Sequence, residues 1–115
     1  MEQLNHIELR GIVGSAKVQR IANANVANFT LATNLAYRDK DGTPVIETTW
    51  HNVTAWEGKG IADLTRLEKG SKVYLVGRIR NQRFTGADGS ERTATEVVAR
   101  SLAFLPSEET LQYQL

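Results

Sequence analysis

An alternation of apolar and polar residues runs through most of this 115-residue chain, and it limits the possible folds more than any other feature of the sequence. Successive side chains of a β-strand point to opposite faces, so this alternation is typical of strands with one buried face. The predicted strands are "HIELRGIVG" with its continuation "KVQRI" after a break at Gly14–Ser15, then Val26–Tyr37, Ile46–Trp56, "KVYLVGRIRNQRF" and "RTATEVVARSLAFL". Asp-Gly pairs in "RDKDGTP" and "TGADGSE" indicate turns. The chain is therefore predicted to be all-β.

One stretch, "GIADLTRLEKG", departs from this pattern. Ile61, Leu64 and Leu67 are spaced by three, which predicts one short helix over residues 60–68. The resulting order is typical of the OB-fold, a five-stranded Greek-key barrel with one short helix between strands 3 and 4 and an open face that commonly binds oligonucleotides. Other small barrels share this strand count. The length suits one domain, predicted over residues 1–105 and followed by a short flexible tail, 106–115.

The stretch "TTWHNVTAWEGKG" (48–60) contains both tryptophans of the chain. In a strand, Trp50 and Trp56 share one face with polar residues, while small aliphatic residues share the other. An indole left in water forgoes about 1.5 to 3 kcal/mol that burial would contribute, so a subunit or a flat ligand is expected to cover it. Stacking of a nucleobase on such a ring contributes about 1 to 3 kcal/mol. The pattern favours two base platforms under one strand of nucleic acid.

Two further aromatics stand beside positive charge near predicted hairpin turns. Tyr37 precedes Arg38 and Lys40, and Phe84 follows Arg83. Rings that take bases, interleaved with cations that take phosphates, are typical of proteins that bind unpaired strands. Other aromatics fit a structural role: Phe29 and Phe104 are predicted in the core, and Tyr74 is taken as structural.

The charge distribution agrees with a polyanionic partner. The formal net charge of the chain is only +1, but residues 1–105 hold 14 basic against 11 acidic side chains. The run "KVYLVGRIRNQR" (72–83) has four basic residues and no acidic one. A solvated basic face is the plain alternative for such a run when it stands alone, and the neighbouring aromatics favour the nucleic-acid interpretation.

Several phrases, taken in order, resemble the bacterial single-stranded DNA-binding protein family. They are "NHIELRGIVG", "VANFTLAT", "YRDKDG", "TTWHNVTAW", "LEKGSKVYLVGRIR" and "TATEVV", from about residue 5 to residue 105. The resemblance implies an OB-fold that assembles into a homotetramer wrapped by single-stranded DNA, with roles in DNA replication, recombination and repair. It places the family's stacking residues at Tyr37, Trp50, Trp56 and Phe84, with some ring types exchanged, and its basic contacts at Arg38, Lys40, Lys69, Arg80, Arg83 and Arg92.

The sequence departs from the family at three places. Asn52 stands where the family often has a basic residue, and Lys59 is displaced by one position from the usual lysine. The third departure is the end of the chain, "SEETLQYQL", which lacks the family's long linker and acidic tip. The family uses that tip to recruit replication and repair enzymes, so the resemblance supports DNA coating and leaves such partners uncertain.

Two other classes of function compete with DNA coating. An enzyme is disfavoured because the chain has no cysteine, no serine elbow and no phosphate loop. The alternative is a tail-less primosomal or mobile-element adaptor that binds single-stranded DNA weakly and serves mainly as a docking surface. Four base platforms favour coating, since a docking module does not need them. RNA stays open as a ligand, because stacking does not read the sugar.

The remaining expectations concern location and cofactors. No segment approaches the roughly 18 to 20 apolar residues of a membrane span, and "MEQLNHIELRG" has no apolar run of signal-peptide length. We therefore expect a cytoplasmic protein associated with the nucleoid. No metal or other cofactor is expected, because His6 and His51 lack the spacing of metal ligands and there are no thiolates.

Overall fold

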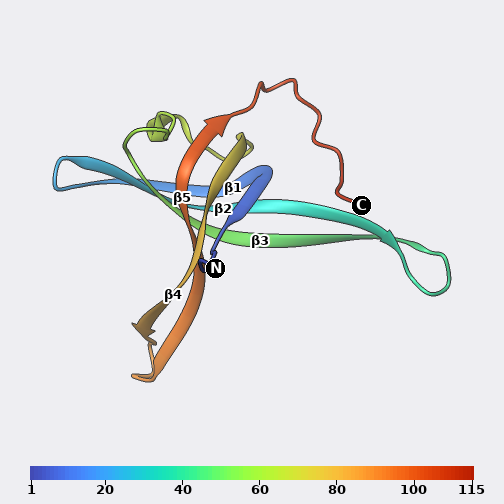
Figure 1. Cartoon of the computed structure of the whole chain (residues 1–115), viewed down its shortest axis with the longest axis horizontal. Coiled ribbons are helices and arrows are strands. Elements are labelled where there is room, and N and C mark those ends of the chain that lie inside the picture. The colour runs from blue at the N-terminus through green and yellow to red at the C-terminus, as the bar shows by residue number, and fades with distance from the viewer.

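Five strands form a closed antiparallel barrel with one parallel contact (Figure 1). The computed structural model describes all residues, 1–115. Its elements are β1 (Ile7–Ile21), β2 (Ala24–Arg38), β3 (Pro44–Trp56), the 3-10 turn η1 (Leu64–Arg66), β4 (Lys72–Thr85) and β5 (Glu91–Phe104). Around the barrel the order is β1-β2-β3-β5-β4. The predicted all-β, five-stranded Greek-key barrel is confirmed.

The long first strand and a short parallel seam close the barrel. β1 pairs with β4 through its first half and with β2 through its second half, with a bulge between Val13 and Ser15. This bulge is the break predicted at Gly14–Ser15, and it lets one strand turn from one neighbour to the other. The seam between β3 and β5 has only two residue pairs, Val53 with Val97 and Thr54 with Val98.

Inward-facing residues of all five strands, joined by the connector around η1, fill the barrel. The core consists of Leu9, Val13, Ala27, Phe29, Leu31, Val53, Ala55, Leu64, Leu67, Val73, Leu75, Val97 and Leu102. The prediction for Phe29 is confirmed. Phe104 is only partly buried, because it packs at the rim of the core with the Arg66 guanidinium 5.0 Å from its ring centre. Tyr74 is partly buried, and its hydroxyl donates to the Glu8 carboxylate.

The short helix predicted between strands 3 and 4 is present as the single 3-10 turn η1, which is shorter than the predicted range of residues 60–68. Ile61 instead forms an isolated bridge with Leu102, so the start of this connection runs extended beside β5. The spacing of three between the buried Leu64 and Leu67 suits a 3-10 turn, which has three residues per turn, better than an α-helix. No helix in the structure has the length and hydropathy to span a bilayer.

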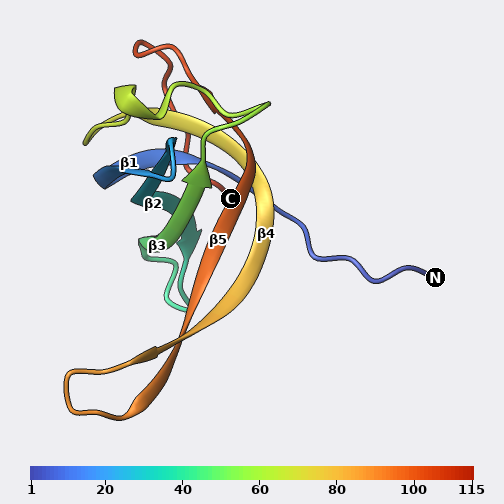
Figure 2. The ribbon, with the colours of Figure 1, turned by 90° about the vertical axis from the view of Figure 1, so that its left-hand side faces the viewer.

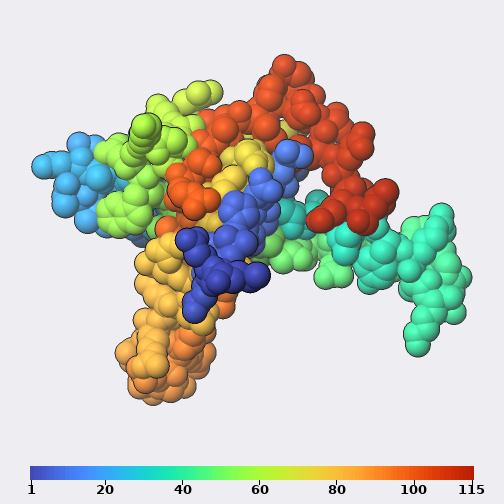
Figure 3. Space-filling model, viewed as in Figure 1, coloured from blue at the N-terminus to red at the C-terminus, as the bar shows by residue number.

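Two hairpins extend beyond the barrel as arms. β1 leaves β2 at Ala32, whereas β2 and β3 stay paired as far as Arg38 and Pro44. Residues 33–49 therefore form a β2–β3 arm, and residues 80–96 form a β4–β5 arm beyond the last pairing of β4 with β1. Figure 2 shows the β4–β5 arm reaching away from the barrel, and Figure 3 shows both arms standing clear of the packed body.

Both ends of the chain are tied to strands by hydrogen bonds. The Asn5 side chain donates to the Ile79 carbonyl (2.7 Å) and accepts from the Ile79 N–H (2.9 Å). At the other end, the Ala36 N–H donates to the Gln114 carbonyl (2.8 Å) and the Gln114 N–H donates to the Asn34 carbonyl (2.9 Å). The last residues therefore add a short parallel bridge to the free edge of β2 on the arm.

Candidate nucleic-acid interface

The outer face of β3 carries both tryptophans. Trp50 is 59% exposed and Trp56 is 46% exposed, while Val53 and Ala55 of the opposite face are buried in the core. This separation follows from strand alternation, which turns every second side chain away from the barrel. Two broad aromatic surfaces are therefore open to solvent on one strand, as the alternation of side chains along the sequence predicted.

A shallow groove separates the two tryptophans. On the outer face the pair Ala32 and Trp50 is followed by Thr30 with Asn52, by Asn28 with Thr54, and by Val26 with Trp56. The groove has a volume of about 290 Å³ and is lined by Ser15, Asn28, Phe29, Thr30, Asn52, Val53, Thr54 and Glu96. Most of these side chains are uncharged and polar. Asn28, Thr30 and Glu96 carry no motif that marks them in the sequence, although pairing of Val26–Tyr37 with the tryptophan strand places the first two on this face.

The Trp50 indole lies across the sheet toward β1. A methyl group placed on Gly14 would come within 2.4 Å of the ring, and within 3.0 Å of the Thr30 hydroxyl oxygen. Gly14 sits at the β1 bulge, and its missing side chain leaves the space that the indole occupies. The ring is thus supported from below by backbone and keeps its other surface exposed.

The β2–β3 arm carries Tyr37 with two cations. Tyr37 is 45% exposed near the end of β2. The next residue, Arg38, donates to the Gly42 carbonyl (2.8 Å), and Lys40 lies exposed in the turn. Asp39 shapes this turn, because its carboxylate accepts from two backbone N–H groups of the loop. Neither Arg38 nor Lys40 forms an ion pair, so both charges are free to meet an anion.

The β4–β5 arm carries Phe84, 47% exposed, with two arginines that already have acidic neighbours. Arg83 lies 3.8 Å from Glu91, and Arg92 lies 3.3 Å from Asp88. Both pairs are solvent-exposed, and such pairs contribute only about 0 to 1 kcal/mol. The hydrogen bonds from the Ser90 hydroxyl and N–H lower the pKa of Asp88 and keep it charged.

Arg80 is held more firmly than the other predicted cations. Its Nε lies 2.6 Å from one oxygen of Glu96, and the Thr54 hydroxyl donates to the other oxygen (2.7 Å). The Glu96 side chain is 12% exposed, so this charge is largely withdrawn from water. The contacts join β4, β5 and β3 beside the short parallel seam. A structural role for the pair follows from this placement.

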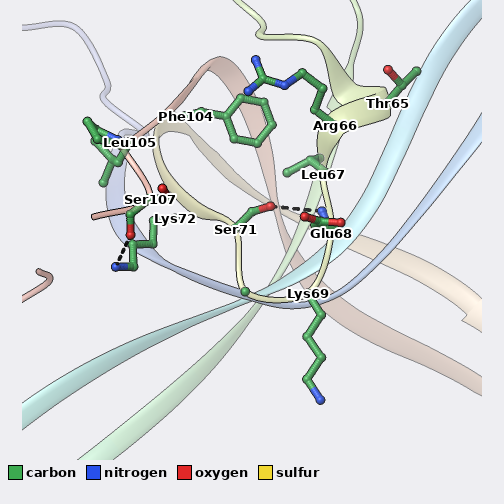
Figure 4. A pocket seen from close by; sticks show the side chains of 12 residues that line it. Thr65, Arg66, Leu67, Glu68, Lys69, Ser71, Lys72, Phe104, Leu105 and Ser107 are labelled. Atoms are coloured by element: carbon green, nitrogen blue, oxygen red, sulfur yellow. Dashed lines mark hydrogen bonds between the residues drawn. The ribbon is translucent and has the colours of Figure 1, made fainter. Parts of the chain in front are cut away.

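Lys69 lies on the connector before β4, apart from both arms. In Figure 4 its side chain points away from Leu67 and Phe104, which line a cavity of about 660 Å³ on that side of the barrel. The adjacent Gly70 N–H donates to the Val13 carbonyl (2.8 Å), and Val13 precedes the glycine beneath Trp50. The connector thereby places Lys69 near the Trp50 end of the groove.

His51 faces away from the tryptophans. Its Nε2 lies 2.9 Å from the Thr33 hydroxyl, and partial burial lowers the pKa of the imidazole. The ring is therefore neutral near pH 7 and hydrogen-bonded to the neighbouring strand. This arrangement supports the pairing of β2 with β3.

Comparison with known proteins gives a family match over most of the chain. A family model described as the Single-strand binding protein family matches residues 4–105. A Single-stranded DNA-binding protein of Neisseria meningitidis serogroup A is 38% identical over 104 residues, which cover 89% of this chain and 60% of that protein. One from Xylella fastidiosa is 40% identical over 80 residues, 70% of this chain and 49% of that protein. The chain thus spans about half to three fifths of the length of these curated relatives.

Solved structures agree with the barrel. The structure titled "Plasmodium falciparum SSB complex with ssDNA" superimposes with a TM-score of 0.73 at 27% identity, covering 92% of this chain and 98% of that one. A deletion mutant of the single-stranded DNA binding protein from Thermus aquaticus also gives a TM-score of 0.73, at 21% identity. The second likeness supports the fold alone.

Proposed function

This chain belongs to the single-strand binding protein family, and on that premise we propose that it binds single-stranded DNA with little sequence preference. Aromatic rings stack on the bases and basic side chains contact the phosphates. The proposed role is to protect exposed strands during replication, recombination and repair at the nucleoid. Proteins of this family bind DNA and are not enzymes.

The exposure of four large aromatic side chains carries the proposal. Close to half of the surface of each ring is open, at Tyr37, Trp50, Trp56 and Phe84. A soluble domain gains nothing from leaving such surface in water, since burial of each ring would stabilise the fold by roughly 1.5 to 3 kcal/mol. Unpaired bases supply flat apolar surface of matching size, and a base in a duplex does not, because its faces are already stacked.

The predicted cations divide into three groups in this proposal. Arg38, Lys40 and Lys69 have no acidic partner and contact phosphates directly. Arg83 and Arg92 exchange their weak exposed acidic partners for phosphates when DNA binds. Arg80 keeps its ion pair with Glu96 and acts mainly by holding β4 and β5 together beside the groove.

We further propose that the chain works as a homo-oligomer, most simply a tetramer, as the family resemblance implies. Large apolar side chains outside the stacking set support this part of the proposal. Ile46 is 55% exposed and Ile79 is 42% exposed, and a second copy of the chain would cover such surface. A strand of DNA would then pass from one copy to the next.

A titration with oligo-dT tests the proposal. Tryptophan fluorescence of the wild type is expected to be quenched, and the logarithm of affinity is expected to fall with the logarithm of salt at about 0.7 per phosphate neutralised. The double variant Trp50→Ala/Trp56→Ala is expected to bind labelled oligo-dT at least about 30-fold more weakly by fluorescence anisotropy, since each stacked base contributes about 1 to 3 kcal/mol. Tyr113→Ala, which removes an exposed ring outside the proposed site, serves as the matched control.

Equal binding by the wild type and the double variant would refute the platform assignment. A folded wild-type protein that binds neither oligo-dT nor the matching RNA would refute the proposed function itself. Comparison of the two ligands also decides the preference between DNA and RNA, which stacking alone does not set.

A further inference from the structure

The groove between Trp50 and Trp56 differs in charge from the rest of the proposed interface. None of its eight lining residues is a lysine or arginine, and one of them, Glu96, is a carboxylate. The nearest predicted cation, Arg80, is bound to that carboxylate at 2.6 Å. A phosphate over this floor would meet one negative charge, whereas the free cation Lys17 stands on β1 opposite Asn28, at the margin of the groove. The margin of the groove therefore suits the DNA backbone better than its centre does.

Two carboxamides supply the free hydrogen-bonding groups of this floor. The Asn52 side chain is exposed and makes no hydrogen bond within the chain. The Asn28 carboxamide uses one of its two polar ends at the Thr54 hydroxyl (2.9 Å), whose single proton is donated to Glu96, and its other end is left for a ligand. The other polar atoms are occupied, since both Glu96 oxygens accept hydrogen bonds and the Ser15 and Thr30 hydroxyls lie 3.1 Å apart.

A carboxamide can recognise the edge of any base. It carries donor N–H groups beside an acceptor oxygen, and the edge of each nucleobase offers a neighbouring acceptor and donor. When the amide group flips, its donor and acceptor exchange places, so it can pair with a base edge in which the acceptor lies on either side of the donor. Hydrogen bonds of this kind add affinity without selecting a sequence, which suits a groove between two sequence-tolerant stacking platforms.

We propose that this groove is a subsite for base edges, in which Asn52, assisted by Asn28, hydrogen-bonds nucleotides that cross from Trp50 to Trp56. The inference rests on the proposed function and deepens it. It assigns bases to the centre of the sheet and phosphates to its cationic margins. Asn52 carries no charge, so the contact that it makes is insensitive to salt.

The test compares two substitutions at one exposed position. Asn52→Ala is expected to weaken binding to oligo-dT, oligo-dC and oligo-dA by about three- to tenfold each, the effect of one or two net hydrogen bonds. Its salt slope is expected to equal that of the wild type, because no charge is lost. Asn52→Lys is expected to increase the slope by about 0.7, and Arg83→Ala to decrease it by about 0.7, as phosphate contacts require.

A strand of abasic deoxyribose phosphates completes the test. Wild type and Asn52→Ala are expected to bind it equally, since the removed contact needs a base. Loss of affinity by Asn52→Ala on the abasic strand, a changed salt slope, or unaltered binding to all three oligonucleotides would each overturn the subsite. Because these comparisons require a wild type that binds, absence of wild-type binding would count against the proposed function and is distinguishable from failure of the subsite. Thermal melts establish that each variant is folded.

Discussion

At the scale of single residues, Gly14 and Trp50 act as a unit. The indole occupies the space that a side chain at Gly14 would fill, at a bulge where β1 turns between its two neighbours. The pair links a backbone irregularity of one strand to the orientation of a ring on another. The orientation of the stacking residue Trp50 therefore depends on the glycine beneath it as well as on its own exposure.

Gly14→Ala is expected to displace the Trp50 ring, because the new methyl group would come within 2.4 Å of it. Affinity for oligo-dT should fall toward that of Trp50→Ala, a loss of up to about 1 to 3 kcal/mol, and tryptophan emission should shift. Gly58→Ala is the control, since no heavy atom lies within 4 Å of the position of its new methyl group. Wild-type binding and emission in Gly14→Ala would contradict this account.

His51 makes stability depend on pH. Burial lowers the pKa of the imidazole below its ordinary value of 6.5, so the unfolded chain takes up a proton at higher pH than the folded chain does. The contribution of His51 is complete above pH 6.5 and declines as the pH falls through the lowered pKa. Urea unfolding from pH 7.5 to pH 5 is expected to show this decline. His51→Gln, which can keep a hydrogen bond to Thr33, is expected to show a weaker decline, and an unchanged pH profile would argue against this role.

At the scale of elements, the arms explain where the predicted site residues lie. Strand pairing beyond the barrel carries one aromatic and its cations out on each hairpin, whereas both tryptophans stay on the barrel wall. The β2 edge on the arm has no strand beside it after Ala32, and the end of the chain occupies part of it. We propose that residues 1–105 fold without residues 106–115.

Truncation after Leu105 tests that division of the chain. The barrel is expected to stay folded, with its free energy of unfolding reduced by about 1 to 2 kcal/mol, because the removed residues are nearly all exposed and contribute few hydrogen bonds. The Ala36 amide loses the Gln114 carbonyl that accepts from it, and its hydrogen exchange is expected to accelerate. Unchanged exchange at Ala36 would mean that the final residues do not hold the β2 edge in solution, and an unfolded product would refute the domain division.

At the scale of the whole molecule, a small barrel presents a wide surface. The radius of gyration is 16.1 Å, compared with about 13 Å for a compact domain of this length. The two arms, which stand clear of the body in Figure 3, account for the excess. Strand pairing places Tyr37 on one arm and Phe84 on the other, away from the barrel wall. A long unpaired strand can follow such a surface, whereas a compact pocket would hold a single nucleotide.

The proposed assembly predicts the mass in solution. Light scattering is expected to give about four times the 12.8 kDa of one chain. A stable dimer would favour the adaptor alternative, and a mass of one chain would refute the proposed oligomer. Addition of oligo-dT long enough to span several copies is expected to leave the number of chains unchanged and to increase the mass by that of the bound strand.

The sequence by itself determined the strand order, the barrel class and the exposure of the stacking residues. The alternation of side chains between two faces is a local property of a strand, so the neighbours of Trp50 and Trp56 in the chain already show that both lie on the same face. The predicted helix over residues 60–68 is longer than the observed 3-10 turn, because a spacing of three also fits a 3-10 turn and because the bridge between Ile61 and Leu102 keeps the start of the segment extended beside β5. Only the tertiary structure decided which predicted cations have acidic partners, and that Asn28 and Glu96 line a groove with Asn52. These contacts join residues from different strands, and their pairing depends on register and barrel closure, which no single segment encodes.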